Sequence, residues 1–218
     1  MQISSLDSVA VLTFPESEEC PRLTRATLAE IGEHLAAIKS SNCFTGVIIA
    51  ANSRSFAVGA ELGEITELQG FAAREFARAG QSLLRRIAAY PLPVVAAIRG
   101  YCLGGALDLA LACHRRVAAY GSSFGHPGPT LGLITGWGGT QSLPRRLGRA
   151  AALQMLLAGE RIPATQALTL GLVDELVPTS DLAAASASRA QQLRERPYPQ
   201  ITQITQKEET EDRSQESE

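Results

Sequence analysis

The sequence predicts an α/β fold, because short apolar runs alternate with longer segments of helical periodicity. Four runs have the length and the β-branched content of buried strands. They are Val9–Phe14, Gly46–Ala51, Val94–Ile98 and Val117–Tyr120. Helical patterns fill intervals between them, so we expect strands and helices to alternate along the chain.

The first two predicted helices have recognisable boundaries. Thr24 is placed to cap a helix over Arg25–Ile38, since a threonine oxygen can accept from backbone N–H groups of the first turn. A second helix has apolar or small residues at helical spacing, namely Phe76, Gly80, Leu83, Ile87 and Tyr90. Pro91 and Pro93 lack the N–H that a helix interior needs, so they end this helix.

The second half of the chain continues the alternation. The predicted elements are helices over Arg145–Leu157, Thr165–Leu170 and Leu182–Arg194 and a short strand over Leu172–Val177. From Lys207 to Glu218 there are six acidic residues, two basic residues and no apolar residue. Such a segment has no apolar surface to bury, so we expect a folded domain over residues 1–206 and a disordered acidic tail over residues 207–218.

Composition and charge exclude several functional classes. The 218 residues include 20 Lys and Arg against 22 Asp and Glu, which gives a formal charge of -2. This balance argues against binding to nucleic acid or to a membrane surface. The four cysteines form no C-x-x-C pair and the three histidines have no ligand spacing, so neither a disulfide framework nor a metal site is expected.

Two further features bear on the cellular compartment. The N-terminus has neither a basic region nor an apolar run, so no secretory signal is expected and the cytoplasm is the predicted location. The stretch from Val117 to Pro144 contains no Asp, Glu, Lys or Arg and is long enough to cross a bilayer. Its glycines and three prolines would break a spanning helix. We therefore predict irregular backbone packed inside the protein.

Three glycine-bearing turns follow predicted strands, over residues 55–62, 100–108 and 132–141. Such turns let backbone N–H groups approach a ligand, although many serve only as tight connections. In the second turn Gly105 precedes a predicted helix over Ala106–Cys113, and Asp108 lies one turn in. A carboxylate beside an exposed N–H suits a reaction in which a proton moves while a carbonyl oxygen gains charge. Alternatively, Asp108 only stabilises the helix N-terminus.

Two other kinds of site are excluded. Residues 121–125 match the G-x-S-x-G pattern of serine hydrolases, which would make Ser123 a nucleophile. That motif needs a helix after the serine, but Pro127 and Pro129 follow, and no histidine lies beyond His126. A dinucleotide-binding fold is excluded as well, because no G-x-G-x-x-G opens a helix after the first strand.

Four motifs carry a resemblance to a known family. They are FAVGAE at 56–61, PVVAAIRGYCLGGALDLALAC at 93–113, FGHP at 124–127 and GWGGTQ at 136–141. In order and spacing they resemble the enoyl-CoA hydratase/isomerase family, also called the crotonase superfamily. The match runs from Val9 to Pro178 and includes LGLVD at 170–174.

The resemblance implies a crotonase-like (ClpP/crotonase) superhelix of ββα units that binds acyl-CoA thioesters. By motif position, the N–H groups of Ala60 and Gly105 would hold the thioester oxygen and Asp108 would be the catalytic carboxylate. Fixed donors of this kind stabilise an enolate in a dry site. The implied substrate-binding residues are Ala60, Glu61, Leu62, Gly63, Gly105 and Gly128. No cofactor is implied beyond the coenzyme A of the substrate, and the implied assembly is a homotrimer or a hexamer of two trimers.

The sequence departs from the family where the chemistry is decided. Hydratases of the family have glutamates at the positions of Asp108 and Gly128, whereas here the first side chain is one C–C bond (about 1.5 Å) shorter and the second is absent. Isomerases commonly use an acid at the Gly128 position, and dienoyl-CoA isomerases add one at Gly136. Naphthoate synthases also have glycine at the Gly128 position, but Thr135 stands in place of their aspartate.

These departures leave two hypotheses open: a lyase or isomerase that works through a thioester enolate, and a non-catalytic CoA-binding or oligomer-forming relative. His126, Glu61 and Glu64 are titratable residues near the motifs that could replace the missing acid, although a buried histidine more often only packs. A Gly128→Glu substitution is expected to restore a carboxylate opposite Asp108 and to raise hydration.

Two more expectations concern coenzyme A and the C-terminus. Lysines are scarce, since Lys39 and Lys207 are the only two, so Arg22 or Arg54 is expected to meet the CoA phosphates. Family members continue after the Leu182–Arg194 helix with helices that close the acyl site. We expect these closing helices to be absent here.

Overall fold

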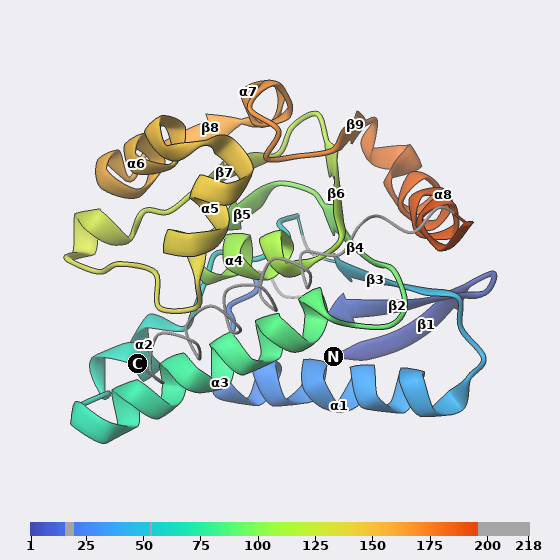
Figure 1. The fold of residues 1–218 in the computed structure, drawn as a ribbon, viewed down its shortest axis with the longest axis horizontal. Helices are drawn as coiled ribbons and strands as arrows, with labels where there is room; N and C mark the ends of the chain where they lie inside the picture. Colours follow the sequence, from blue (N-terminus) through green and yellow to red (C-terminus); the bar gives the residue numbers. More distant parts are fainter. Residues whose placement is uncertain (16–19, 53, 196–218) are drawn as a thin grey trace, which may run out of the picture.

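The computed structural model describes residues 1–15, 20–52 and 54–195 of the chain (Figure 1). The predicted acidic tail and the domain boundary at residue 206 lie outside the described residues. The described chain forms a mixed α/β structure of two sheets and surrounding helices, as the alternating pattern predicts.

The larger sheet has six strands in the order β1-β2-β3-β4-β6-β9. They are β1 (Gln2–Leu6), β2 (Val9–Phe14), β3 (Gly46–Ala51), β4 (Val94–Ile98), β6 (Arg115–Ala119) and β9 (Glu175–Val177). β1 pairs antiparallel with β2, and every later pair is parallel. The first three predicted strands are confirmed with their bounds, while the fourth begins two residues earlier than predicted.

The smaller sheet has three strands in the order β5-β7-β8, namely β5 (Tyr101–Leu103), β7 (Ser123–Gly125) and β8 (Arg161–Pro163). β5 follows β4 after a turn at Gly100, and β7 follows β6 after a turn at Gly121. Between strands of the larger sheet the chain therefore adds strands to the smaller sheet: β5 comes between β4 and β6, and β7 comes between β6 and β9. None of the three short strands was predicted, because three residues carry too little periodicity to be recognised.

Eight α-helices accompany the described strands, with two short 3₁₀ helices. The α-helices are α1 (Arg25–Ser41), α2 (Leu62–Thr66), α3 (Gly70–Ala88), α4 (Gly105–Ala112), α5 (Gly139–Leu147), α6 (Arg149–Ala158), α7 (Ala164–Thr169) and α8 (Leu182–Glu195). The 3₁₀ helices are η1 (Gly128–Leu131) and η2 (Thr179–Asp181). Thr24 caps α1 as predicted, since its Oγ1 accepts from the N–H of Thr27 at 3.0 Å.

The larger sheet is buried on both faces, which explains its continuous apolar runs. Along β4, Val95 and Ala97 face a small core completed by Ala187 and Ala190 of α8. The alternate residues of the same strand, among them Ala96, face the main core on the other side. α8 packs over β3, β4 and β6, and α1 and α3 lie together on the opposite side of the molecule (Figure 1).

The single helix predicted over Arg145–Leu157 is wrong. The structure has two helices there, α5 and α6, separated at Gly148, whose φ of +80° and ψ of 160° are not helical. A glycine adopts this backbone without strain, so the break depends on conformational freedom that periodicity does not reveal. Its effect is to turn α6 against α5, beside η1.

The uncharged stretch over Val117–Pro144 forms the rest of β6, then β7, η1 and the first residues of α5. The prediction of irregular, packed backbone is therefore only partly confirmed: the stretch contains regular elements, and Leu131 and Ile134 are 57% and 71% exposed. No helix in the described ranges has both the length and the apolar character needed to cross a membrane.

Candidate active site

Two of the predicted glycine turns lie side by side. Ala57 pairs with Cys102: the Ala57 N–H donates to Tyr101 O at 3.1 Å, and the Leu103 N–H donates to Ala57 O at 3.1 Å. Just beyond this pairing, Gly59 has a φ of +104°. A side-chain carbon at Gly59 would lie 3.2 Å from the Leu103 carbonyl oxygen, so a glycine is needed both for the backbone and for the close approach.

Each turn presents an N–H group without a partner in the described part of the chain. Around Ala60, the Leu23 N–H donates to Gly59 O at 2.8 Å and the Glu61 N–H donates to Leu23 O at 3.1 Å. The N–H of Ala60, which lies between these two residues in the chain, takes part in neither bond. Gly105 is the first residue of α4, so its N–H belongs to the open donors of a helix N-terminus. Ala60 and Gly105 are thus two backbone donors on adjacent turns.

A cavity of about 430 Å³ lies beside both donors. Its apolar lining residues include Ile65, Leu68, Phe76, Leu133, Ile134 and Trp137. Its polar side chains are Arg22, Asp108, His126 and Thr135. The Trp137 ring packs directly on Gly80 of α3 and on Gly105, where any side chain would collide with it. An apolar cavity with few polar groups is typical of a binding site for a small molecule.

Asp108 lies in the first turn of α4 and is only 2% exposed. The hydroxyl of Thr135 donates a hydrogen bond to its Oδ2. Its Oδ1 lies 3.2 Å from Nε2 of His126 without a hydrogen bond between them, and both atoms are fully buried without a partner among the described residues. The backbone of Gly139 closes over this carboxylate, since a Cβ there would collide with Oδ1.

Gly128, at the position of the second family glutamate, begins η1 and lines the cavity. The surroundings of Gly128 count against the expected effect of Gly128→Glu, which stays a prediction. A Cβ at this position would lie 2.7 Å from the carbonyl oxygen of Leu133, whose N–H already donates to Gly128 O at 2.9 Å. Because the obstacle is backbone, a glutamate requires the loop to move and does not simply restore a carboxylate.

The other predicted substrate-binding residues divide into two groups. Leu62 lines the cavity together with Ala60 and Gly105, whereas Glu61 and Gly63 are not among its lining residues. Glu61 caps α2: its carboxylate accepts from the Gly63 N–H at 3.2 Å and lies 3.4 Å from Nη1 of Arg22. The hydrogen bond from Gly63, and then Arg22, hold the pKa of Glu61 below its ordinary value.

Two further residues predicted near the site, Glu64 and Arg54, do not line the cavity. Glu64 accepts from the backbone N–H of Arg25 at 3.0 Å, and it does not line the cavity. Of the two predicted phosphate partners, Arg22 lines the cavity and Arg54 does not. His126 is therefore the one of the three proposed substitutes that the described structure brings to Asp108.

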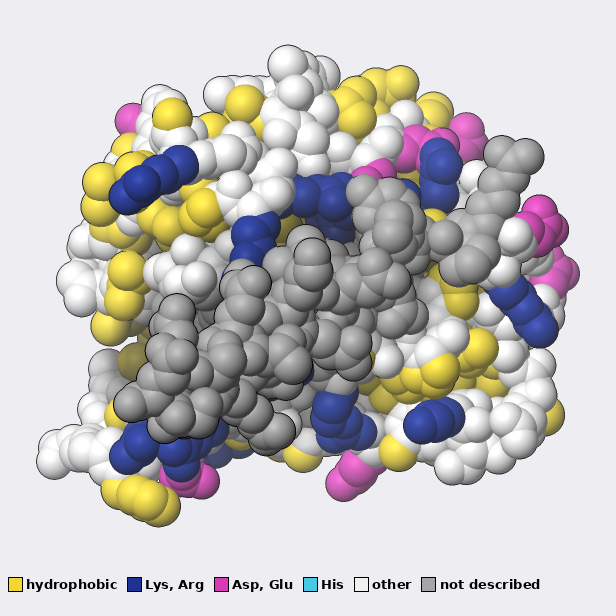
Figure 2. Space-filling view, in the orientation of Figure 1, with side chains coloured by type: hydrophobic (Ala, Val, Ile, Leu, Met, Phe, Trp, Pro, Cys, Tyr) yellow, Lys and Arg dark blue, Asp and Glu magenta, His cyan; other side chains and the backbone are white. Residues whose placement is uncertain are grey.

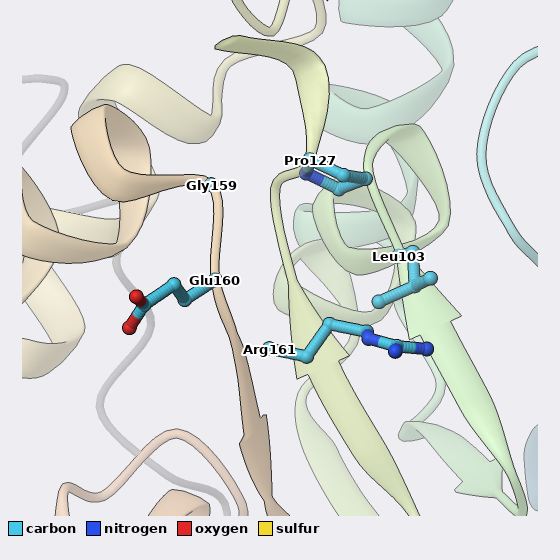
Figure 3. Close-up of a pocket in the computed structure, with 5 residues that line it drawn as sticks. All are labelled: Leu103, Pro127, Gly159, Glu160 and Arg161. Carbon is cyan, nitrogen blue, oxygen red and sulfur yellow. The ribbon is translucent and has the colours of Figure 1, made fainter. Parts of the chain in front are cut away.

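A second hollow, drawn in Figure 3, shares the lining residue Pro127 with the first. It measures about 480 Å³ and is lined by Leu103, Pro127, Gly159, Glu160 and Arg161. It opens widely to the surface, and the Arg161 guanidinium lies 5.1 Å from the ring centre of Tyr101. The cavity beside Asp108 is the better candidate, because it combines open backbone donors with buried polar atoms that lack partners.

Comparison with known proteins decides the family. The sequence profile described as enoyl-CoA hydratase/isomerase matches residues 5–218. The chain belongs to the enoyl-CoA hydratase/isomerase family. This confirms the resemblance that the four motifs carry.

Solved structures of the family confirm the crotonase-like fold. An enoyl-CoA hydratase from Bacillus anthracis is 30% identical with a TM-score of 0.82, and the match covers 88% of this chain and 75% of that chain. An enoyl-CoA hydratase from Polaromonas sp. JS666 is 31% identical with a TM-score of 0.81, covering 88% and 76%. DspI from Pseudomonas aeruginosa is 27% identical with a TM-score of 0.83, covering 91% and 75%.

Two contacts of Asp108 in the candidate site were not predicted from the sequence. The hydrogen bond from Thr135 to Asp108 could not be predicted, because 27 residues separate the two side chains. The contact between Gly139 and Asp108 had a signal in the GWGGTQ motif, whose glycines indicate a close approach of backbone. Which group the backbone approaches is visible only in the fold.

Proposed function

We propose that the chain is an enzyme that acts on an acyl-CoA thioester through an enolate. The observation that supports this most is the combination of two open N–H groups, at Ala60 and Gly105, with the buried carboxylate of Asp108 in one apolar cavity. Donors held rigidly in a water-poor site stabilise a developing oxyanion strongly, since they need no reorganisation during the reaction.

In the proposed reaction the thioester oxygen accepts from the two N–H groups, and Asp108 takes a proton from a carbon of the acyl chain. The C–H electron pair moves toward the thioester, whose oxygen becomes the enolate oxygen. Oδ2 of Asp108 is engaged by Thr135, so Oδ1 is the oxygen left to receive the proton. Trp137, packed on Gly105, helps to exclude water from this step.

The residues at the two family acid positions favour proton transfer over hydration by two carboxylates. Only Asp108 carries a carboxylate there, because Gly128 has no side chain and lies too near the Leu133 carbonyl to gain one easily. We therefore propose an isomerase or a lyase whose first step is removal of a proton by Asp108. Arg22, at the cavity, is the proposed partner of a CoA phosphate.

The rival proposal is a relative that binds CoA thioesters without turning them over. Titration calorimetry with acetyl-CoA and crotonyl-CoA, against free CoA, tests binding. A panel of crotonyl-CoA, 3-enoyl-CoA and dienoyl-CoA tests turnover. Binding with turnover of any substrate supports the enzyme, binding without turnover supports the rival, and no heat up to millimolar thioester contradicts both.

We also propose a trimer, or a hexamer of two trimers. Apolar side chains gather over α6 and η1 on the face shown in Figure 2. Leu131 of η1 and Leu157 of α6 are 57% and 72% exposed, and Ile134, which follows η1 along the chain, is 71% exposed. Exposed apolar side chains grouped in this way are typical of an interaction surface. Light scattering at micromolar concentration should give a multiple of three chains, and a clean monomer would contradict the proposal.

A further inference from the structure

His126 reaches the site by a short and rigid path. It follows β7 directly, and the last residue of that strand, Gly125, accepts a hydrogen bond from the Gly104 N–H at 2.9 Å. The strand is thereby fixed to the turn that precedes α4. The His126 side chain is 4% exposed, lines the cavity and faces the side chain of Asp108.

The contact between His126 and Asp108 contains an unusual pair of atoms. Nε2 of His126 and Oδ1 of Asp108 are fully buried, lie 3.2 Å apart and have no hydrogen-bond partner in the described ranges. Leaving two buried polar atoms unpaired is unfavourable, and native structures rarely do so without a reason. At 3.2 Å, one proton shared between them, carried by either atom, would satisfy both.

We propose that His126 is a second proton-transfer residue of this site and forms one unit with Asp108. The inference rests on the proposed action on acyl-CoA thioesters and adds to it the group that replaces the missing second acid. Asp108 on α4 is the carboxylate within 4 Å of the imidazole among the described residues. Glu160 and Arg161 lie beyond Pro127, around the hollow in Figure 3.

The unit supports a proton shift along a 3-enoyl thioester. Asp108 takes the proton from carbon 2, the C–H bond breaks, and its electron pair enters the dienolate. The N–H at Nε2 gives its proton to carbon 4, where a dienolate electron pair forms the new C–H bond. The proton on Oδ1 then passes to Nε2. The product is the 2-enoyl thioester, and both residues return to their starting charge.

Kinetics of single and double variants test whether the two residues act as a unit. His126→Gln should lower the rate of 3-enoyl-CoA isomerisation about 10²- to 10⁴-fold, the range typical of a general acid or base. Residues of one unit are strongly non-additive, so Asp108→Asn/His126→Gln should lose little more than the worse single variant. Losses that multiply would overturn the pairing.

A matched control and a binding measurement separate this role from general damage. His34→Gln replaces a half-buried histidine on α1, away from the cavity lining, and should isomerise at the wild-type rate. Binding of crotonyl-CoA to His126→Gln should stay within about threefold of wild type. Wild-type isomerisation by His126→Gln would overturn the inference and leave the proposed function standing.

A measurement without substrate keeps the proposal testable if His126→Gln folds poorly. In ¹⁵N-labelled wild-type protein, the imidazole N–H signal of His126 should exchange slowly with solvent. In Asp108→Asn it should shift, because a neutral amide replaces the charged acceptor. The same signal in both proteins overturns the pairing. If the wild type binds thioesters but does not isomerise 3-enoyl-CoA, the proposed proton shift is overturned and the proposed action on thioesters is not. If the wild type binds no thioester, both the proton shift and the proposed function are overturned.

Discussion

Two carboxylates of this molecule, Asp174 and Asp108, are held in opposite ways. Asp174 is surrounded by cations: its Oδ2 accepts from the N–H and Nη2 of Arg116 at 2.9 and 2.6 Å, and its Oδ1 pairs with Arg146 and lies 3.6 Å from Nε of Arg115. Asp108 has one hydroxyl and a neighbouring imidazole. Both oxygens of Asp174 have partners, whereas Oδ1 of Asp108 has no hydrogen-bond partner among the described residues.

The cluster around Asp174 has a structural purpose. Arg116 is 2% exposed, and its guanidinium also donates to the carbonyl oxygens of Leu172 at 2.9 Å and Cys113 at 2.8 Å. Burial lowers the pKa of Arg116 to about 10, with Asp174 acting in the opposite direction. The cluster therefore joins β6, α4 and the segment before β9. A buried charge that is fully paired fixes the fold, while one left partly unpaired is available for chemistry.

The largest expected effect is on stability, from Asp174→Asn. Removing one partner of a buried ion pair leaves the other charge uncompensated, which typically costs about 3–5 kcal/mol. Urea unfolding of Asp174→Asn should show a loss of this size. Asp108→Asn should cost less than Asp174→Asn, because its amide oxygen can still accept from Thr135 and the change leaves no buried cation unpaired. Equal losses in the two variants would contradict the comparison.

Thr135→Val should have the next largest effect. It removes the hydroxyl that donates to Oδ2 of Asp108, and a hydrogen bond to a charged group contributes about 1.5–3 kcal/mol. Urea unfolding should report a loss in that range. Thr135→Ser keeps the hydroxyl and should recover most of the lost free energy of unfolding. If Thr135→Ser is as destabilised as Thr135→Val, packing of the methyl group and not the hydrogen bond is responsible.

Gly139→Ala should be destabilising by overpacking, by about 1–3 kcal/mol, because its Cβ would collide with the Asp108 carboxylate. The same change should lower turnover, since it displaces the proposed base. Gly121→Ala is the matched control: a Cβ there meets no atom within 4 Å, so unfolding and turnover should match wild type. Thermal unfolding with activity assays on both variants checks this, and a harmless Gly139→Ala would disprove the tight contact.

The smallest expected effect is a pH dependence at His114. Its Nδ1 accepts from the Val94 N–H at 2.9 Å, and burial, with Arg115 and Arg116, lowers the pKa of His114 below its ordinary value of 6.5. The unfolded chain then binds more protons, so stability is complete above pH 6.5 and falls below it, by at most about 1.4 kcal/mol per pH unit.

Urea midpoints at pH 7.5 and 5.5 measure this dependence. His114→Asn keeps a possible acceptor for Val94 and loses the titrating group, so its stability should change less between the two pH values than that of the wild type. The same change in both proteins would assign the pH dependence to other groups.

The sequence was sufficient for those parts of the fold that depend on local patterns. Three buried strands and the Thr24 cap follow from runs and spacing, and the motifs place Ala60 and Gly105 on turns that the structure brings together. The break at Gly148 depends on a backbone angle. The contacts of Asp108 with Thr135 and His126 join segments distant in sequence, so only the fold reveals them.

The most direct test of the account is hydrogen exchange at the α-carbon of a saturated acyl-CoA. Wild-type protein incubated with butyryl-CoA in D₂O should introduce deuterium at the α-carbon, detected by mass spectrometry. Exchange requires only that the α-carbon lose a proton to form the enolate and then gain a deuteron from solvent. Asp108→Asn should slow this exchange about 10²- to 10⁴-fold while binding butyryl-CoA with nearly unchanged affinity. Exchange by Asp108→Asn at the wild-type rate would contradict the role of Asp108 as the base.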